Sequence, residues 1–214
     1  MEDLKNTHLD NFNIIIDCGH GGINSKGVYT TAPNKMHTFS DGEVIYEGVI
    51  NRQIGKRVFE FLEELGYCPV YVVHPDDSRD LPLKRRVNYI NSFDPKNSIG
   101  VSFHSNASPG HNARGHEIWT SVGETRSDIL ATYIGEEIID EFPEIRFRPD
   151  FSDWDLDKES QFYILRKTLC PFVLLELLFF DNKKDAELLK SPNYQKRVAW
   201  RITNGIIRYL KTLR

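Results

Sequence analysis

The chain has 214 residues, 40% of them hydrophobic and 27% charged, and its 27 Lys and Arg against 31 Asp and Glu give a net charge of −4. This length suits one domain with a single core, and the composition is that of an ordinary soluble globular protein. The lack of a basic surplus argues against a nucleic-acid partner, and no run reaches the roughly 20 apolar residues that span a membrane.

The predicted strands and helices alternate along the chain. In chain order they are a strand at 12–17, a polar loop to about 42, a helix at 45–65, a strand at 69–73, a helix at 81–91, strands at 98–104 and 115–120, a helix at 127–142, a charged loop at 143–159, strands at 162–165 and 172–178, and helices at 185–189 and 194–213. The first helix rests on apolar residues three and four apart, such as Ile50, Ile54 and Val58, and Gly66 is predicted to stop it.

This alternation predicts an α/β fold, with a largely parallel twisted β-sheet of about six strands flanked by helices on both faces. Residues 1–214 are expected to form a single domain with a core of about 12–210, because no repeat, low-complexity segment or Pro- and Ser-rich linker interrupts the chain. The cysteines Cys18, Cys68 and Cys170 are odd in number and far apart, which predicts neither a disulfide framework nor a cysteine zinc site. We expect a monomer.

Two histidines follow predicted strands. His20 comes directly after the first strand in IDCGHGG, where the glycines let the backbone turn sharply. His104 ends the strand SIGVSFHSN, in which every second residue is a large apolar one. Ligand sites of open α/β sheets lie beyond the carboxyl ends of the strands, so both positions are typical of a functional site. Each histidine alone would also suit a plainer role, as a solvated loop residue or a hydrogen-bonded residue at the edge of the core.

Glu47 stands at the head of the apolar face that continues through Ile50 and Ile54. A carboxylate is therefore predicted on the buried side of the helix, where a bound cation would offset the cost of burying its charge. Two alternatives remain open. The helix could begin later and leave Glu47 as an exposed acid in the first turn, or Glu43, one turn earlier, could take its place.

Glu176 interrupts the apolar run PFVLLELLFF. Buried glutamates usually have a partner or a chemical task. The position therefore indicates either a structural ion pair or a catalytic base at the carboxyl end of a central strand. Two histidines and one carboxylate form a common catalytic zinc set that leaves the fourth position open, although no local motif such as H-E-x-x-H is present here.

Several blocks resemble the type 3 family of zinc-dependent N-acetylmuramoyl-L-alanine amidases, found among cell-wall hydrolases and phage endolysins. IIIDCGHGG is similar to the family's IDPGHGG block, EGVINRQIGKRVFEFLEELGY to the segment that opens with a liganding glutamate, and VSFHSNAS to the S-x-H-x-N-A block. FYILRKTLCPFVLLELLFFDNKKDAELL is similar to the block with the catalytic glutamate, and LPLKRRVNYIN to a helix of the L-x-x-R-x-x-x-x-N type. The blocks occur in the family's order between about 12 and 209.

The resemblance implies that His20, Glu47 and His104 hold one Zn²⁺ per chain and that Glu176 is the catalytic base. It also implies that the substrate is bacterial peptidoglycan, cut at the amide bond between N-acetylmuramic acid and L-alanine. No separate cell-wall-binding domain is expected. Asn106 and Arg166 are predicted substrate contacts, with ordinary surface or supporting hydrogen bonds as an equal alternative.

The chain departs from the family pattern in places. Cys18 stands where proline is usual, and Leu178 stands where a glycine usually follows the catalytic glutamate by two. A leucine there is bulky enough to crowd the pocket wall. The loop at 28–42 is expected to shape a specific substrate groove, and the segment at 143–159 is too short and polar for the blocking helix of regulated members.

Two other functions fit the same residues: a zinc peptidase that cuts within the stem peptide, and a non-catalytic peptidoglycan-binding module. The N-terminal segment MEDLKNTHLDNFN is polar and acidic and lacks the features of a secretory signal. We therefore expect synthesis in the cytoplasm without a signal peptide and action on the cell wall after release, through a holin-type pore if the protein is phage-derived.

Overall fold

The computed structural model describes residues 12–150 and 155–213. Residues 1–11, which make up most of the segment in which the sequence predicts no secretory signal, lie outside these ranges. Residues 151–154 of the predicted charged loop also lie outside them. Within the described ranges, no helix combines the length and the apolar character needed to cross a membrane.

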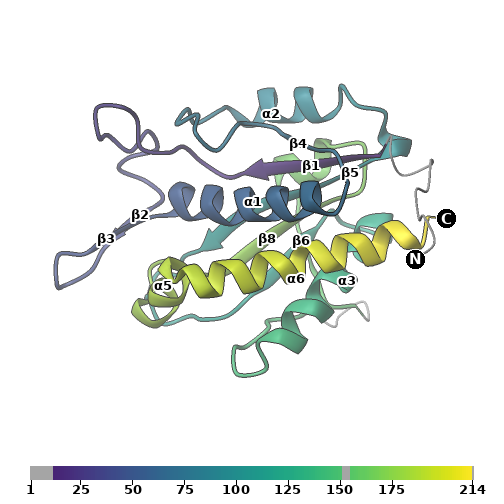
Figure 1. Cartoon of the computed structure of the whole chain (residues 1–214). Coiled ribbons are helices and arrows are strands. Elements are labelled where there is room, and N and C mark those ends of the chain that lie inside the picture. Colours follow the sequence, from purple (N-terminus) through teal and green to yellow (C-terminus); the bar gives the residue numbers. More distant parts are fainter. Residues whose placement is uncertain (1–11, 151–154, 214) are drawn as a thin grey trace.

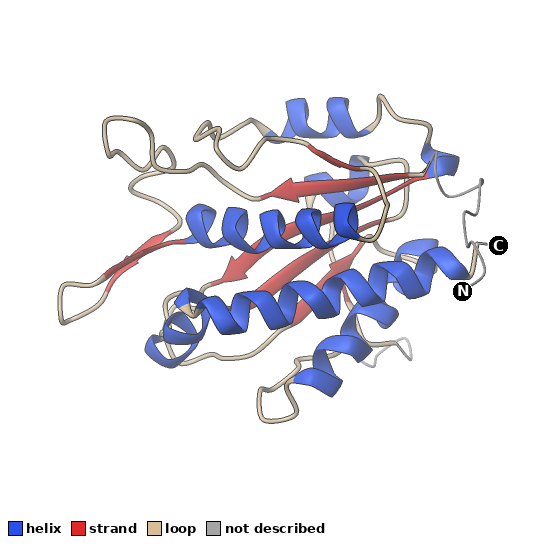
Figure 2. Cartoon of the chain, viewed as in Figure 1, coloured by secondary structure: helices blue, strands red, loops and turns tan. Residues whose placement is uncertain are grey.

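A six-stranded sheet forms the centre of the fold, with helices on both of its faces (Figures 1 and 2). The strand order is β4-β1-β5-β8-β6-β7, and only the β6–β8 pair is antiparallel. The strands of this sheet are β1 (Asn13–Cys18), β4 (Pro69–Tyr71), β5 (Ser98–Asn106), β6 (Glu117–Thr120), β7 (Lys158–Glu159) and β8 (Phe172–Phe179). The predicted fold class, with a largely parallel sheet in a single α/β domain, is confirmed.

The helices fall into two layers. One face of the sheet is covered by α1 (Glu47–Glu64), α3 (Arg126–Glu141), α5 (Lys183–Lys190) and α6 (Pro192–Lys211). The other face carries the shorter α2 (Leu83–Ile90) and α4 (Tyr163–Lys167). A short 3₁₀ turn, Pro95–Asn97, precedes β5.

The ends of the main helices follow from local chemistry. Gly66 has a φ of +84° and its N–H donates to the carbonyl of Glu63, so it stops α1 as predicted. The side chain of Thr125 accepts from Ser127 N–H and Asp128 binds back to Thr125, which forms a capping box at α3. The side chain of Ser191 caps α6 by accepting from Tyr194 N–H, ahead of a proline in the first turn of the helix.

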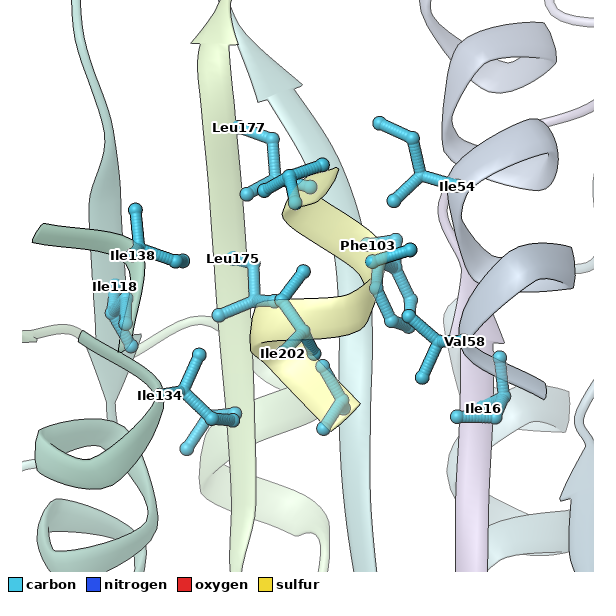
Figure 3. Close-up of a cluster of buried hydrophobic side chains, with 14 of the residues drawn as sticks. Ile16, Ile54, Val58, Phe103, Ile118, Ile134, Ile138, Leu175, Leu177 and Ile202 are labelled. Atoms are coloured by element: carbon cyan, nitrogen blue, oxygen red, sulfur yellow. The ribbon is translucent and has the colours of Figure 1, made fainter. Parts of the chain in front are cut away.

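The main hydrophobic core lies between the sheet and the larger helix layer (Figure 3). Phe103 of β5 and Leu175 of β8 point from the sheet toward Ile54 of α1 and Ile202 of α6. Alternate residues of the same strands point to the opposite face, where a second apolar cluster lies under α2 and α4. The central strands are therefore buried on both faces, as expected for parallel strands.

Three predicted assignments differ from the structure. The segment 162–165, predicted as a strand, forms the N-cap and the first residues of α4. The sixth strand of the sheet is instead β7, inside the predicted loop at 143–159. A two-stranded antiparallel hairpin, β2 (Met36–Thr38) and β3 (Val44–Tyr46), occupies part of the predicted polar loop and the first residues of the predicted helix. Strands of two or three residues carry too short a pattern to distinguish them from loops.

The three cysteines are free thiols. Cys18 and Cys170 are buried, and burial raises the pKa of their thiols to about 12 and about 11. Cys68 is exposed, immediately before β4.

The crossing of α3 and α6 is close enough to require glycine. A Cβ at Gly205 would lie 2.6 Å from Ile134 Cα and 2.8 Å from Ile134 N, which are backbone atoms of α3. We expect Gly205→Ala to lower the free energy of unfolding by about 1–3 kcal/mol, the usual cost of overpacking, as measured by denaturant unfolding.

Gly135 of α3 supplies the matched control. A Cβ there would first meet the ring tip of Phe147 at 3.3 Å, a side chain that can shift. Alanine also gains helix propensity at this position. Gly135→Ala should therefore be the more stable of the two variants, by at least about 1 kcal/mol. Equal stability of the two would mean that the helix crossing tolerates a methyl group.

Candidate metal centre and active site

A pocket of about 510 Å³ opens at the carboxyl edge of the sheet. It takes side chains from the ends of β1, β5 and β8, from the loop before α2, and from α4 and the residue before it. Its lining includes Asp17, Gly19, His20, Lys35, Asp80, Leu81, Pro82, Leu83, Arg86, His104, Phe162, Tyr163, Ile164, Leu174 and Glu176. The strands β1, β5 and β8 thus end where α/β sheets commonly bind ligands.

His20 and His104 line this pocket, and the buried carboxylate of Glu47 lies against both of them. Glu47 Oε1 lies 3.2 Å from His20 Nε2 and 3.0 Å from His104 Nδ1. One donor atom from each of the three residues lies within 4.8 Å of the others. Three segments far apart in the sequence therefore bring together the residues that the sequence pattern singled out.

Each of these side chains is held in place by its own segment. His20 has a φ of +65°, a conformation uncommon for residues other than glycine, which turns its side chain back toward the sheet edge. His104 lies near the end of β5, on the face opposite the main core, and any Cβ at Gly19 would clash with its ring at 2.2 Å. The glycine beside His20 is therefore required for the two imidazoles to approach each other.

Glu47 is the first residue of α1, and it is 1% exposed. Its Oε1 also accepts hydrogen bonds from Ser105 N–H and from Asn51 Nδ2, each at 3.3 Å. The helix thus begins early enough to bury this carboxylate, and the alternative of an exposed acid in the first turn is wrong. The rival Glu43 lies in the hairpin, where it pairs with Lys183 and Lys190.

The three groups alter each other's protonation. Burial lowers the pKa of His20. Burial also acts to lower the pKa of His104, but the hydrogen bond and charge of Glu47, together with the charges of Glu176 and Asp17, raise it overall. Burial alone would raise the pKa of Glu47, but its contacts with His104 and His20 lower it well below the usual range. Glu47 is therefore an anion placed between two imidazoles.

This donor set fits a divalent metal ion such as zinc. Two imidazole nitrogens and a carboxylate oxygen are a common three-residue set of catalytic zinc sites. His20 Nε2 and Glu47 Oε2 are buried atoms that find no hydrogen-bond partner within the described protein. Buried polar atoms without a partner are costly, and a bound cation would satisfy them.

Glu176 enters the same pocket from β8, paired in register with His104 on β5. Its Oε2 is buried without a hydrogen-bond partner, and burial raises the pKa of this carboxyl to about 8, with His104 acting in the opposite direction. No ion pair of Glu176 occurs among the described residues. The structural ion pair that the sequence left as an alternative therefore does not explain why a glutamate stands in this apolar strand. A carboxyl with a pKa near neutrality can both accept and return a proton.

Arg86 of α2 organises the loop that carries His20. Its guanidinium donates to Asp17 Oδ1 and to the carbonyl of Cys18, both at 2.7 Å, and to the carbonyl of His20 at 3.2 Å. Its Nε donates to the carbonyl of Leu81 at 2.8 Å. Arg86 is the arginine of the L-x-x-R block, and it joins the end of β1 to the loop on the far side of the pocket.

We expect Arg86→Met to be strongly destabilising. Arg86 and Asp17 form a buried ion pair with 2% and 1% exposure, so removal of the guanidinium leaves a buried carboxylate without its cation. Breaking such a pair costs about 3–5 kcal/mol, which denaturant unfolding would register directly. Arg85→Met is the control, since Arg85 is the exposed neighbour on the same helix. Equal losses for both variants would contradict the assignment.

The two predicted substrate contacts lie elsewhere. Asn106 donates to Glu117 Oε2 at 3.0 Å, and Glu117 in turn binds Arg148 and Lys158. Arg166 is exposed on α4. Neither residue is part of the pocket lining. Their contact with substrate stays a prediction, while Lys35 and Asp80, which do line the pocket, were not singled out by the sequence pattern.

Leu178 does not crowd the pocket wall. It is fully buried in the main core and is not part of the pocket lining. Its φ of +65° reverses the strand alternation, so that Leu177 and Leu178 both face the core, next to the register shift between β5 and β8. A positive φ is the conformation that glycine adopts without strain, which explains why a glycine suits this position.

The fold and the pocket define an α/β domain whose candidate metal centre lies at the carboxyl edge of its sheet beside a glutamate. Comparison with known sequences then identifies the family: the chain belongs to the N-acetylmuramoyl-L-alanine amidase family, whose sequence model matches residues 14–208. The sequence resemblance is thereby confirmed across nearly the whole chain.

Individual relatives agree with this assignment. The chain is 31% identical to an uncharacterized cell wall amidase of Bacillus anthracis, covering 96% of this chain but 36% of that protein. It is 25% identical to the germination-specific N-acetylmuramoyl-L-alanine amidase of Bacillus subtilis, covering 92% of this chain and 78% of that protein. The crystal structure of an N-acetylmuramoyl-L-alanine amidase from Clostridium difficile 630 superposes with a TM-score of 0.76 at 27% identity, over 95% of this chain and 98% of that one.

Proposed function

We propose that this protein is a zinc-dependent N-acetylmuramoyl-L-alanine amidase, which hydrolyses the amide bond between N-acetylmuramic acid and L-alanine in bacterial peptidoglycan. The observation that carries the proposal is the cluster of His20, Glu47 and His104 at the pocket that Glu176 also lines, in a chain of the amidase family. We further propose that each chain holds one zinc ion, through His20, Glu47 and His104, and that the chain acts as one catalytic domain on the cell wall.

The residues of the pocket divide the chemistry among them. When bound, zinc supplies a Lewis acid for a carbonyl oxygen and lowers the pKa of water to about 7. Glu176 accepts a proton from the attacking water and returns it to the amine of the departing alanine. Its burial and its raised pKa support this double role, because a general acid–base group works best when its pKa is near the working pH.

Arg86 and Gly19, the glycine beside His20, fix the part of the pocket that carries His20 and His104. Arg86 fixes the carbonyl of His20, and the lack of a side chain at Gly19 lets His104 approach. A site whose supporting contacts are rigid loses little free energy to reorganisation during the reaction. The side chains proposed to hold the metal are thereby in position before the substrate binds.

The test is digestion of purified peptidoglycan by the zinc-loaded protein, with mass spectrometry of the soluble products. We expect release of stem peptides that begin with a free L-alanine amine, and loss of this release when zinc is removed with a chelator. Fragments cut inside the stem peptide would assign the enzyme to the peptidases. Binding of peptidoglycan without any release would support a binding module instead.

A further inference from the structure

Lys35 is fixed on the rim of the pocket, next to the metal centre. Its carbonyl accepts the N–H of Glu47 at 3.0 Å, which ties the chain before the hairpin to the first turn of α1. The next residue, Met36, begins β2 and pairs with Tyr46 of β3. Lys35 itself has a φ of +58°, a turn conformation that aims its side chain out of the hairpin ladder.

The far part of the hairpin is attached to α5, so the rim is held from two sides. Lys183 Nζ lies 2.5 Å from Asp41 Oδ2 and 2.9 Å from Glu43 Oε2, and Lys190 also pairs with Glu43. The same Lys183 ammonium lies 4.7 Å from the ring centroid of Phe39. A network of this kind restrains a hairpin that would be marginal alone.

The ammonium of Lys35 donates no hydrogen bond to another described residue. Its Nζ lies 3.7 Å from Glu47 Oε2, too far for a hydrogen bond, and its side chain is 48% exposed. The other cation of the pocket lining, Arg86, directs its donors to Asp17 and to backbone carbonyls. Among the described residues that line the pocket, Lys35 is therefore the cation that has a long ion pair with Glu47 but keeps its N–H donors available for a ligand.

The opposite wall of the pocket is apolar. It consists of the loop before α2 and the start of α4, where Leu83 is 50% exposed and Phe162 is 42% exposed. Three acidic side chains line the described pocket: Asp17 pairs with Arg86, Glu176 lies beside the metal cluster, and Asp80 accepts from Thr31 at 2.7 Å and lies 3.5 Å from Arg86. The charges of Asp17 and Asp80 are therefore already compensated. A ligand thus meets a positive side and an apolar side.

A cation held by His20, Glu47 and His104 would share this space with Lys35. Two positive centres that face one pocket attract an anion, and the attraction is stronger there than in open water. The substrate amide itself carries no charge. The anion must therefore belong to a part of the substrate close to the cleaved bond.

We propose that Lys35 binds the carboxylate of the acidic residue that follows L-alanine in the stem peptide, so that the enzyme prefers stems in which this carboxylate is free over stems in which it is amidated. The proposal rests on the proposed function. Each extended residue spans about 3.3–3.6 Å, so the carboxylate of the second residue beyond the cleaved amide lies roughly 7 Å from that amide. The long side chain of Lys35, whose Nζ lies 3.7 Å from the metal-ligand candidate Glu47, can reach a group at this distance. Lysine binds such a group as a point charge.

The experiment compares two soluble muropeptides that differ only in a carboxylate or a carboxamide on the residue after L-alanine. We expect the wild-type protein to show a kcat/KM about tenfold higher for the carboxylate form, the size of a single charge-assisted contact. In Lys35→Met the ratio of the two kcat/KM values should fall to about one. Lys35→Arg should keep a preference for the carboxylate, and Lys26→Met, an exposed lysine of the same loop outside the pocket, should match the wild type.

Two readouts other than turnover separate the possible outcomes. Zinc content of Lys35→Met should equal that of the wild type; a loss of zinc would mean that Lys35 only positions Glu47, and would overturn the proposal. Binding of the uncleaved muropeptides to the Glu176→Gln protein, measured by calorimetry, should show the same preference for the carboxylate. Equal cleavage of both forms by the wild type refutes the role of Lys35 and leaves the amidase function intact, whereas cleavage of neither form refutes the function.

Discussion

Replacement of Glu176 by glutamine is expected to abolish nearly all turnover while zinc remains bound. Glutamine keeps the shape of the side chain but cannot accept a proton, and loss of a general acid–base group typically lowers the rate about 10²–10⁴-fold. Glu176 is not part of the His20, Glu47 and His104 cluster, so zinc affinity should change little. Initial rates of stem-peptide release and the zinc content of the purified variant are the measurements.

The control for this substitution is Glu187→Gln, on the exposed side of α5 and outside the pocket. It should match the wild type in both rate and zinc content. If Glu176→Gln kept near-normal activity, another residue would be the base. If it lost zinc together with activity, Glu176 would be part of the metal centre.

Replacement of Glu47 by glutamine should remove both zinc and activity. The neutral amide loses the anionic donor between the two imidazoles, whose contacts lie at 3.2 and 3.0 Å. Loss of even an outer partner of a metal ligand typically costs about 10–100-fold in affinity, and loss of a ligand should cost more. Competition with a chromophoric chelator measures the zinc affinity, and unfolding with and without zinc measures the coupled stability.

Glu43→Gln is the matched control, because Glu43 is the acidic residue one turn earlier that the sequence alone left as a rival. In the structure Glu43 pairs with Lys183 and Lys190 rather than with the histidines. The variant should therefore bind zinc as the wild type does. Zinc loss in Glu43→Gln, with zinc retained in Glu47→Gln, would reverse the assignment of the ligand.

Much of the fold could be predicted because the long elements carry strong periodicity. The helix from 47 and the strands around Ile16, Val101 and Val173 are buried on the faces that their sequence patterns indicate. The segment 162–165 was assigned wrongly because four residues, FYIL, fit a strand and a helix equally well. Its helical state is decided by packing against α2, which no local pattern records.

The candidate site was predictable only in part. The two histidines follow parallel strands, and parallel strands bring their carboxyl ends to one edge of the sheet, so their proximity follows from the fold class. Arg86 could have been found from the L-x-x-R block, but its bonds to Cys18 and His20 depend on how α2 crosses the end of β1. Lys35 carries no such signal, because its position depends on a hairpin that the sequence pattern does not reveal.

Because two of the three thiols are buried, a thiol reagent should label the protein at the remaining cysteine alone. Cys18 and Cys170 are buried and hold their protons strongly, so a maleimide reagent, which attacks through the thiolate, has little access to them. Cys68 is exposed and precedes the amino end of β4, which runs parallel to β1. The pocket lies at the carboxyl ends of the strands, so a fluorophore on Cys68 would sit at the opposite end of the sheet. Such a single-dye protein could be followed on isolated cell walls with its catalytic edge left unmodified.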